Sequence, residues 1–131
     1  MRKGQTSVEV VILTAVLLVI FILFLVVISH RNNVSLFLSK KFSAQELGYT
    51  AANAINGAYI GSYGTNTTIY LPSRLDGNDY TISIINSTRL LRISYTGTYE
   101  EFPLIAQDIS GKFVKGSLNY VINDAGVIKI E

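Results

Sequence analysis

The N-terminal part of the chain contains an apolar run long enough to cross a lipid bilayer. The run Val10–Ile28 has 19 residues, of which Thr14 is the only polar one. At about 1.5 Å per residue, a helix of this length nearly matches the roughly 30 Å hydrocarbon core of a membrane. A secretory signal has a shorter apolar region followed by small residues, whereas here Ser-His-Arg follows at 29–31. We therefore expect a membrane span at residues 10–28 without cleavage on its far side.

Charged residues on either side of the span bear on its orientation and on the class of partner. The chain of 131 residues has a net charge of +2, and Arg2 and Lys3 account for both charges. They favour a cytoplasmic N-terminus, although Arg31, Lys40 and Lys41 beyond the span weaken this argument. The Lys40-Lys41 pair is too short to follow a phosphate backbone. We therefore expect no nucleic-acid partner.

One acidic residue, Glu9, directly precedes the apolar run. An ionised carboxylate near lipid is costly and usually marks a functional position. The alternative is that Glu9 is an interfacial residue just outside the bilayer. The residues around it favour the functional interpretation, because positions 3–13 have the sequence Lys-Gly-Gln-Thr-Ser-Val-Glu-Val-Val-Ile-Leu.

This stretch, behind a short basic leader and ahead of an apolar run, resembles the class III signal peptide of archaeal type IV pilins. In that family the leader ends in Gly, the mature chain begins at Gln, and the pattern Q-x-S-x-E-x-x-x-L leads into a hydrophobic helix. The matching positions here are Gln5, Ser7, Glu9 and Leu13. The resemblance covers the helix well and the rest of the chain only loosely.

The resemblance implies processing by a prepilin peptidase, an aspartyl enzyme of the membrane that would cleave between Gly4 and Gln5. Residues 1–4 would then be removed. Glycine has no side chain, so Gly4 could lie extended in a narrow protease cleft. Until cleavage, Arg2 and Lys3 would hold the leader at the cytoplasmic surface.

The resemblance also implies that Glu9 acts in assembly, with Gln5, Ser7 and Leu13 as its context. After cleavage Gln5 would carry a protonated α-amino group four residues before Glu9. In type IV pilins the corresponding carboxylate pairs with the amine of a neighbouring subunit. The implied partners are copies of this chain and related pilins, with a pilus assembly ATPase and a membrane platform protein acting indirectly.

Beyond the span, apolar residues recur at intervals of three and four as far as Ala58, which predicts an amphipathic continuation of the helix. Gly48 is a tolerated weak point in this pattern. The pair Asn56-Gly57 predicts the C-terminal end, because both residues accept left-handed backbone angles. The predicted helix therefore covers residues 5–57.

The remainder, residues 58–131, is predicted to be a β-rich head. From Ser62 the apolar pattern changes to period two, and turn signals rich in Asn, Asp and Gly separate the segments. The segments are 67–71, 80–84, 91–95, 118–122 and 127–130. Five or six antiparallel strands are expected, with the amphipathic helix covering their apolar face. The expected class is α+β and type IV pilin-like; strand order, and the choice between a wrapped sheet and a small sandwich, stay open.

Three Asn-x-Ser/Thr sequons, at Asn33, Asn66 and Asn86, are candidate N-glycosylation sites. All three follow the span and would be extracellular. Asn66 and Asn86 fall in predicted loops or turns, where a glycan has room. Asn33 lies near the membrane edge and is the weaker candidate.

Few residues point to catalysis or to a cofactor. The chain has no cysteine, and its single histidine, His30, has no carboxylate or nucleophile nearby in sequence. Asp76, Asp79 and the pair Glu100-Glu101 lack metal-ligand spacing and are predicted to be solvated loop charges. We expect no catalytic residue, no metal site and no cofactor.

The sequence thus favours a structural subunit of an extracellular adhesion pilus, held in the cell membrane as a precursor. A minor pilin or pseudopilin remains an alternative. A motor-filament subunit is less favoured, because archaeal flagellins usually carry different small residues after the processing site. A single-pass membrane protein with an extracellular β-domain would explain the span but not the N-terminal motif. An anchored enzyme is the weakest alternative.

Overall fold

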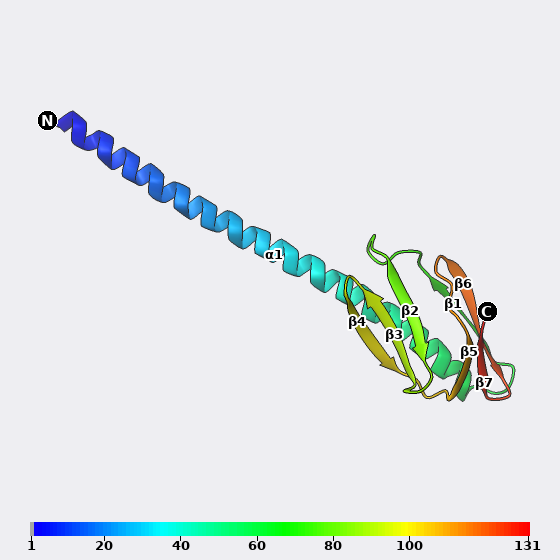
Figure 1. Cartoon of the computed structure of the whole chain (residues 1–131). Helices are drawn as coiled ribbons and strands as arrows, with labels where there is room; N and C mark the ends of the chain where they lie inside the picture. Colours follow the sequence, from blue (N-terminus) through cyan, green and yellow to red (C-terminus); the bar gives the residue numbers. More distant parts are fainter. Residues whose placement is uncertain (1) are drawn as a thin grey trace. The chain divides into compact units, whose positions relative to one another are not determined.

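The computed structural model describes the backbone of residues 2–131 and the side chains of residues 7–131. In this part of the chain one α-helix precedes seven β-strands (Figure 1). The elements are α1 (Arg2–Ile60), β1 (Asn66–Leu71), β2 (Tyr80–Ile85), β3 (Leu90–Tyr95), β4 (Thr98–Pro103), β5 (Asp108–Gly111), β6 (Ser117–Asp124) and β7 (Val127–Ile130). The predicted α+β layout, a long N-terminal helix followed by a small β-rich region, is confirmed and matches a pilin-like fold.

The chain divides into two compact units, which we call the N-terminal unit (residues 1–38) and the C-terminal unit (residues 39–131). The N-terminal unit consists of the first part of α1. The C-terminal unit contains the last part of α1 and all seven strands.

The strands of the C-terminal unit form two sheets. One has the order β1-β6-β7-β5 and the other the order β2-β3-β4 (Figure 1). The prediction of five or six antiparallel strands needs correction, because there are seven strands and the β5–β7 pair is parallel. Period-two patterning assigns the faces of a strand but does not determine its partner or direction, so the sequence could not reveal this pair.

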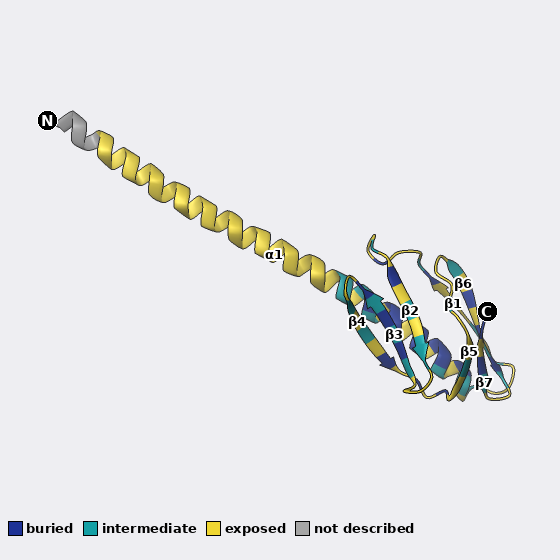
Figure 2. Ribbon diagram, viewed as in Figure 1, coloured by how far each residue is buried: buried dark blue, intermediate teal, exposed yellow. Residues whose placement is uncertain are grey.

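Small helical residues let α1 approach the sheets closely. Ala44, Ala51 and Ala58 are fully buried at intervals of seven residues, and the buried side of the helix appears dark blue in Figure 2. This spacing returns to the same face every two turns. The remaining core comes from both sheets, from connections between strands and from the rest of this helix face: Leu47, Ala52, Ala54, Ile55, Ile69, Leu71, Leu75, Tyr80, Leu91, Ile93, Tyr95, Phe102, Leu104, Ala106, Val121, Ile128 and Ile130.

Gly48 is a close-contact position, which the sequence interpretation of a tolerated weak point missed. A Cβ built on Gly48 would overlap the ring of Phe102 in β4. That ring is 3% exposed and also packs edge-on against Tyr49, with the ring centroids 5.0 Å apart. Glycine therefore sets the distance between the helix and β4.

The helix ends at Ile60, three residues after the predicted stop at Gly57. Neither Asn56 nor Gly57 adopts the left-handed backbone angles expected of a helix stop, and the Asn56 side chain makes tertiary contacts. Its Nδ2 donates to the Pro103 oxygen at 3.2 Å, and its Oδ1 accepts the Ile105 N–H at 2.9 Å. These bonds pair the helix with the backbone at the end of β4 and just beyond it.

The acidic residues predicted to be solvated loop charges occupy more specific places. Glu100 and Glu101 lie within β4, where Glu101 accepts a hydrogen bond from Arg92 of β3 at 2.6 Å. Asp76 lies in the β1–β2 connection, and its Oδ2 accepts from the Ser43 hydroxyl of α1 at 2.7 Å. Successive side chains of a strand point to opposite faces, so one of the two adjacent glutamates takes the place of an apolar residue. The alternation of apolar and polar residues that indicates a strand is therefore interrupted in the sequence.

Candidate functional site

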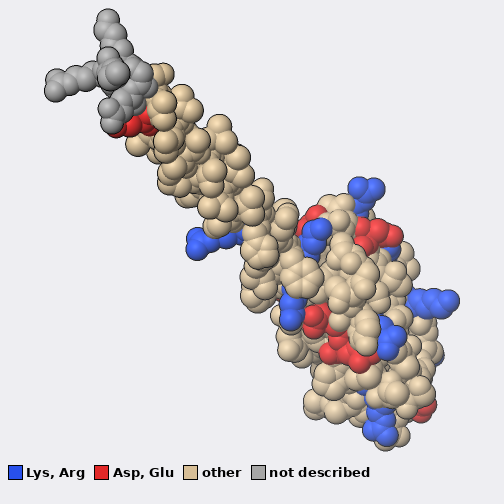
Figure 3. Space-filling model, turned by 60° about the vertical axis from the view of Figure 1, so that its left-hand side comes forward, with Lys and Arg blue, Asp and Glu red and all other residues tan. Residues whose placement is uncertain are grey.

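The N-terminal unit presents the largest apolar surface among the described side chains. Every side chain from Ser7 to Leu38 is exposed, and the large apolar residues of Val10–Ile28 retain between 40% and 65% of their accessible area. The helix contains an 18-residue window with a mean hydropathy of 3.6 and no buried residue. In Figure 3 this segment is an uninterrupted tan surface. By length and composition it can cross a membrane, as the sequence predicted.

Thr14, the one polar residue of Val10–Ile28, does not place an unpaired hydroxyl in apolar surroundings. Its hydroxyl donates to the carbonyl oxygen of Val10 at 2.8 Å, one turn earlier in the same helix. Bonding of this kind satisfies a hydroxyl without an outside partner. The helix also satisfies its own main-chain groups, which a structure in lipid requires. The whole segment can therefore lie in lipid or against other apolar helices.

Three of the predicted assembly residues lie along the start of this segment. Ser7, Glu9 and Leu13 are all exposed, and Glu9 immediately precedes the apolar run. Glu9 and Leu13 are one turn apart and share one side of the helix. A carboxylate thus stands at the edge of a continuous apolar surface, where a positive partner would neutralise it most effectively.

The side chains of the predicted leader and cleavage residues, Arg2, Lys3, Gly4 and Gln5, lie outside the described side chains. Their backbone forms the first turn of α1. The extended Gly4 that a protease cleft would require is therefore not the conformation of this structure. Cleavage between Gly4 and Gln5 would need this turn to unwind. A helix end frays readily, and glycine destabilises a helix by roughly 0.5–1 kcal/mol relative to alanine.

The three sequons occupy different settings. Asn33 lies within α1, in the N-terminal unit, and is exposed. Asn66 is the exposed first residue of β1, and Asn86 begins the exposed β2–β3 turn. Asn66 was predicted to lie in a loop, whereas it pairs with Ile122 of β6. The side-chain nitrogen of Asn86 donates to the Ile109 oxygen of β5 at 3.1 Å.

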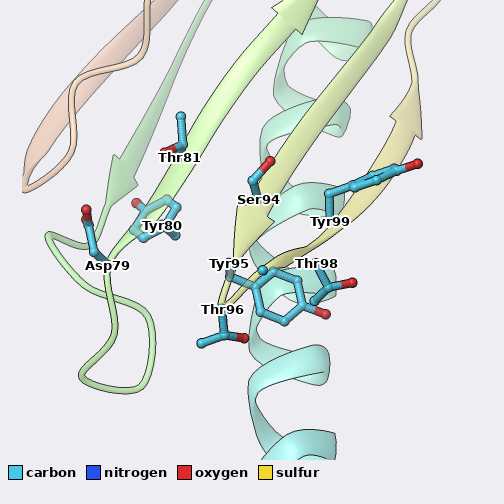
Figure 4. A pocket seen from close by; sticks show the side chains of 9 residues that line it. Asp79, Tyr80, Thr81, Ser94, Tyr95, Thr96, Thr98 and Tyr99 are labelled. Atoms are coloured by element: carbon cyan, nitrogen blue, oxygen red, sulfur yellow. The ribbon is translucent and has the colours of Figure 1, made fainter.

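An open hollow of about 310 Å³ lies beside the β3–β4 turn. Figure 4 shows Tyr95, Thr96 and Thr98 grouped at this turn, with Tyr80 at the start of β2 and Asp79 in the loop before it. The lining consists mainly of hydroxyl-bearing side chains with this single carboxylate. Such a surface can form hydrogen bonds, and its carboxylate is already engaged.

Lys115, from the β5–β6 connection, holds that carboxylate. Its Nζ donates to Oδ1 of Asp79 at 2.5 Å and to the main-chain oxygen of Tyr80 at 2.7 Å. The Lys115 hydrogen bond and charge hold the pKa of the Asp79 carboxyl below its usual value. Burial acts on Tyr80 in the opposite direction and raises the pKa of its phenol to about 12. Lys115 therefore ties two connections together, a role that the sequence did not reveal.

Among the described residues, no group of three or more His, Asp or Glu side chains could hold a metal ion. His30 is exposed on α1, within the N-terminal unit. Comparison of the chain with protein-family models, curated proteins and solved structures finds no match.

Proposed function

We propose that this protein is a structural subunit of an extracellular, type IV-like adhesion pilus, assembled through its N-terminal hydrophobic helix after leader cleavage. The observation that carries the proposal is the apolar surface of Val10–Ile28, exposed around the whole helix with Glu9 at its start. Contiguous apolar surface of this extent requires lipid or an apolar partner. A pilin needs both in succession, lipid before assembly and neighbouring helices afterwards.

Glu9 provides the charge pairing on which the proposed assembly depends. Cleavage after Gly4 would create a positive α-amino group on Gln5, four residues before Glu9. When the helices bundle, both charges leave water, and each would be costly without a partner. Pairing Glu9 of one subunit with the amine of another neutralises both charges. It also favours one axial register, because a shifted helix would leave a carboxylate in apolar surroundings.

Orientation and partners follow from the same proposal. The precursor would have a cytoplasmic N-terminus, where Arg2 and Lys3 meet a prepilin peptidase, and residues 39–131 outside the cell. Further copies of the chain and related pilins are its partners in the filament. An assembly ATPase and a membrane platform protein would act indirectly, by driving extraction of the helix from lipid.

The mass of the mature polypeptide tests this function. Intact-mass measurement should be made on native membranes and on filaments sheared from cells that produce the full chain. We expect a form lacking residues 1–4 in both fractions and its enrichment in the filaments. A native product that retains residues 1–4 and stays singly dispersed in the membrane would contradict the proposal.

The second candidate is a single-pass membrane protein with an extracellular β-domain. One observation favours it: the C-terminal unit has its own hydrophobic core, which includes two sheets and the last part of α1. It predicts an uncleaved N-terminus and no filaments. A minor pilin or pseudopilin would be cleaved yet scarce, so abundance in sheared filaments separates it from the main proposal.

A further inference from the structure

Two edge strands of the C-terminal unit border a groove. β2 is the outer strand of one sheet and β5 the outer strand of the other. Between them lies a groove of about 370 Å³, which falls within the range of about 300–1,000 Å³ of ordinary ligand sites. Its lining residues are Ile82, Ser83, Ile84, Asn86, Ile109, Gly111, Lys112 and Phe113.

The groove combines apolar side chains with unpaired strand edges. Ile82 and Ile84 of β2, with Ile109 and Phe113 from the opposite side, are only partly buried against the core. An edge strand presents N–H and C=O groups that no neighbouring strand satisfies. Two such edges facing one apolar groove form a template for unwanted pairing with other chains. A ligand that covers this groove must therefore have both apolar faces and hydrogen-bonding groups.

Asn86 stands at the lip of this groove. It is the first of four exposed residues that connect β2 and β3. Its Nδ2 donates one hydrogen to the Ile109 oxygen at 3.1 Å and so reaches across from β2 to β5. The second hydrogen on this nitrogen is not needed for that bond. Asn86-Ser87-Thr88 is also a sequon.

We propose that Asn86 carries an N-linked glycan whose first sugars lie in this groove and cover the β2 and β5 edges. The inference rests on the extracellular placement of residues 39–131 proposed above. Sugar rings suit this groove, because their C–H faces can pack on Phe113 and the isoleucines. Their hydroxyls can bond to the free main-chain groups and to Lys112.

The modification replaces one hydrogen of the Asn86 amide. A new bond forms between Nδ2 and the anomeric carbon of a sugar, and the bond from that carbon to the phosphate of a lipid-linked oligosaccharide breaks. The lipid phosphate leaves with the electron pair, and the displaced amide proton passes to solvent or base. The retained N–H can still donate to the Ile109 oxygen. Attachment and the cross-sheet bond are therefore compatible.

Asn66 provides the internal comparison. It is an exposed sequon asparagine, but it pairs with β6 and does not line the groove. A glycan there would project from the start of β1. Only a glycan on Asn86 is expected to protect β2 and β5.

The test uses the full chain produced in its glycosylating host. Variant Thr88→Ala removes the Asn86 sequon, Thr88→Ser keeps it, and Thr68→Ala removes the Asn66 sequon. The mass of the Asn86 peptide reports the modification, and hydrogen exchange of peptides from β2 and β5 reports the cover. We expect a sugar mass on Asn86. Hydrogen exchange of the β2 and β5 peptides should be at least about threefold slower in the wild type and Thr88→Ser than in Thr88→Ala. Thr68→Ala should exchange like the wild type.

Deglycosylation of the folded wild-type protein gives a second route to the same comparison and does not depend on folding of a variant. Faster exchange in β2 and β5 after sugar removal supports the proposal. An unmodified Asn86 peptide, or unchanged exchange after removal, overturns it. The leader mass and the sheared filaments are measured on the same cells, so failure of the pilus proposal is seen separately.

Discussion

The side-chain amide of Asn123 in β6 donates to the main-chain oxygen of Ala58 at 2.9 Å, although the two residues are 65 positions apart. The same nitrogen lies 3.2 Å from the Gly61 oxygen, and the Asn123 Oδ1 accepts the Gly126 N–H at 2.9 Å. The last carbonyls of a helix have no partners within the helix. Asn123 thus caps the end of α1 while it closes the β6–β7 turn.

Replacing Asn123 with alanine should destabilise the C-terminal unit. The side chain is 4% exposed, so its loss leaves buried carbonyl and N–H groups without partners, which costs about 1–3 kcal/mol each. Thermal unfolding of the full chain in detergent should show a clearly lower Tm. Asn53→Ala, at an exposed helical position, is the control and should leave Tm unchanged or higher. Equal Tm values for Asn123→Ala and the wild type would contradict the capping role.

Gly48→Ala should destabilise the protein, although alanine favours helices. The added methyl group overlaps the Phe102 ring, and overpacking of this kind costs about 1–3 kcal/mol. Gly57→Ala is the matched control, because a Cβ there meets nothing within 4 Å. It should stabilise by roughly 0.5–1 kcal/mol. Denaturant unfolding in detergent measures both, and Gly48→Ala combined with Phe102→Leu should recover part of the loss.

Tyr80 should make the protein sensitive to alkali. Its phenol ionises near pH 10 in the unfolded chain, whereas burial raises its pKa to about 12 in the folded protein. Below pH 10 both states keep the proton and this contribution is complete. Between about pH 10 and 12 only the unfolded state loses it, so stability falls as pH rises.

Tyr80→Phe removes this pH dependence. The variant also loses the hydrogen bond from the Tyr80 hydroxyl to the Pro72 oxygen, 2.6 Å long, which should lower stability at pH 7 by about 1 kcal/mol. Its Tm should then fall less than that of the wild type between pH 9 and 11.5. Tyr120→Phe, at an exposed position that does not contribute to the raised Tyr80 pKa, is the control and should keep the wild-type slope. Parallel slopes for Tyr80→Phe and the wild type would argue against this account.

Glu9→Val should leave membrane insertion intact, because it joins Val8 to the apolar run and extends the run by two residues. Filament yield should drop by about tenfold or more, since the α-amino group would be buried without its partner, at a cost of about 3–5 kcal/mol. Thr14→Val is the control. The Thr14 hydroxyl is bonded within its own helix, so this variant should assemble normally. Normal filaments from Glu9→Val would remove Glu9 from the mechanism.

Gly4→Leu should accumulate as unprocessed precursor in the membrane. The proposed peptidase must receive residues 4 and 5 unwound from α1, and a bulky side chain obstructs a narrow cleft. Intact mass should show that residues 1–4 are retained. Gly4→Ala adds only a methyl group and should be processed at least in part. Full processing of Gly4→Leu would place the cleavage elsewhere.

The sequence was sufficient for elements that depend on local pattern. The apolar run defined the potential span, and the period-two segments located β1, β2, β3, β6 and β7 within about two residues of their ends. These elements could be predicted because their apolar side chains must be removed from water, and the spacing of those side chains is visible in the sequence. The assembly role of the residues around Glu9 stays a prediction; the structure describes Ser7, Glu9 and Leu13 as exposed residues of one helix.

The tertiary structure decided the features that depend on a distant partner. β4 was not predicted because Glu100-Glu101 interrupts its alternation of apolar and polar residues. β5 was not predicted because it is only four residues long. The end of α1 moved because Asn123, far along the chain, supplies the cap. The groove at Asn86 exists only because β2 and β5 are edges of different sheets. Local spacing specifies which face of an element is apolar, whereas long-range contacts select its neighbour, its end and its open edges.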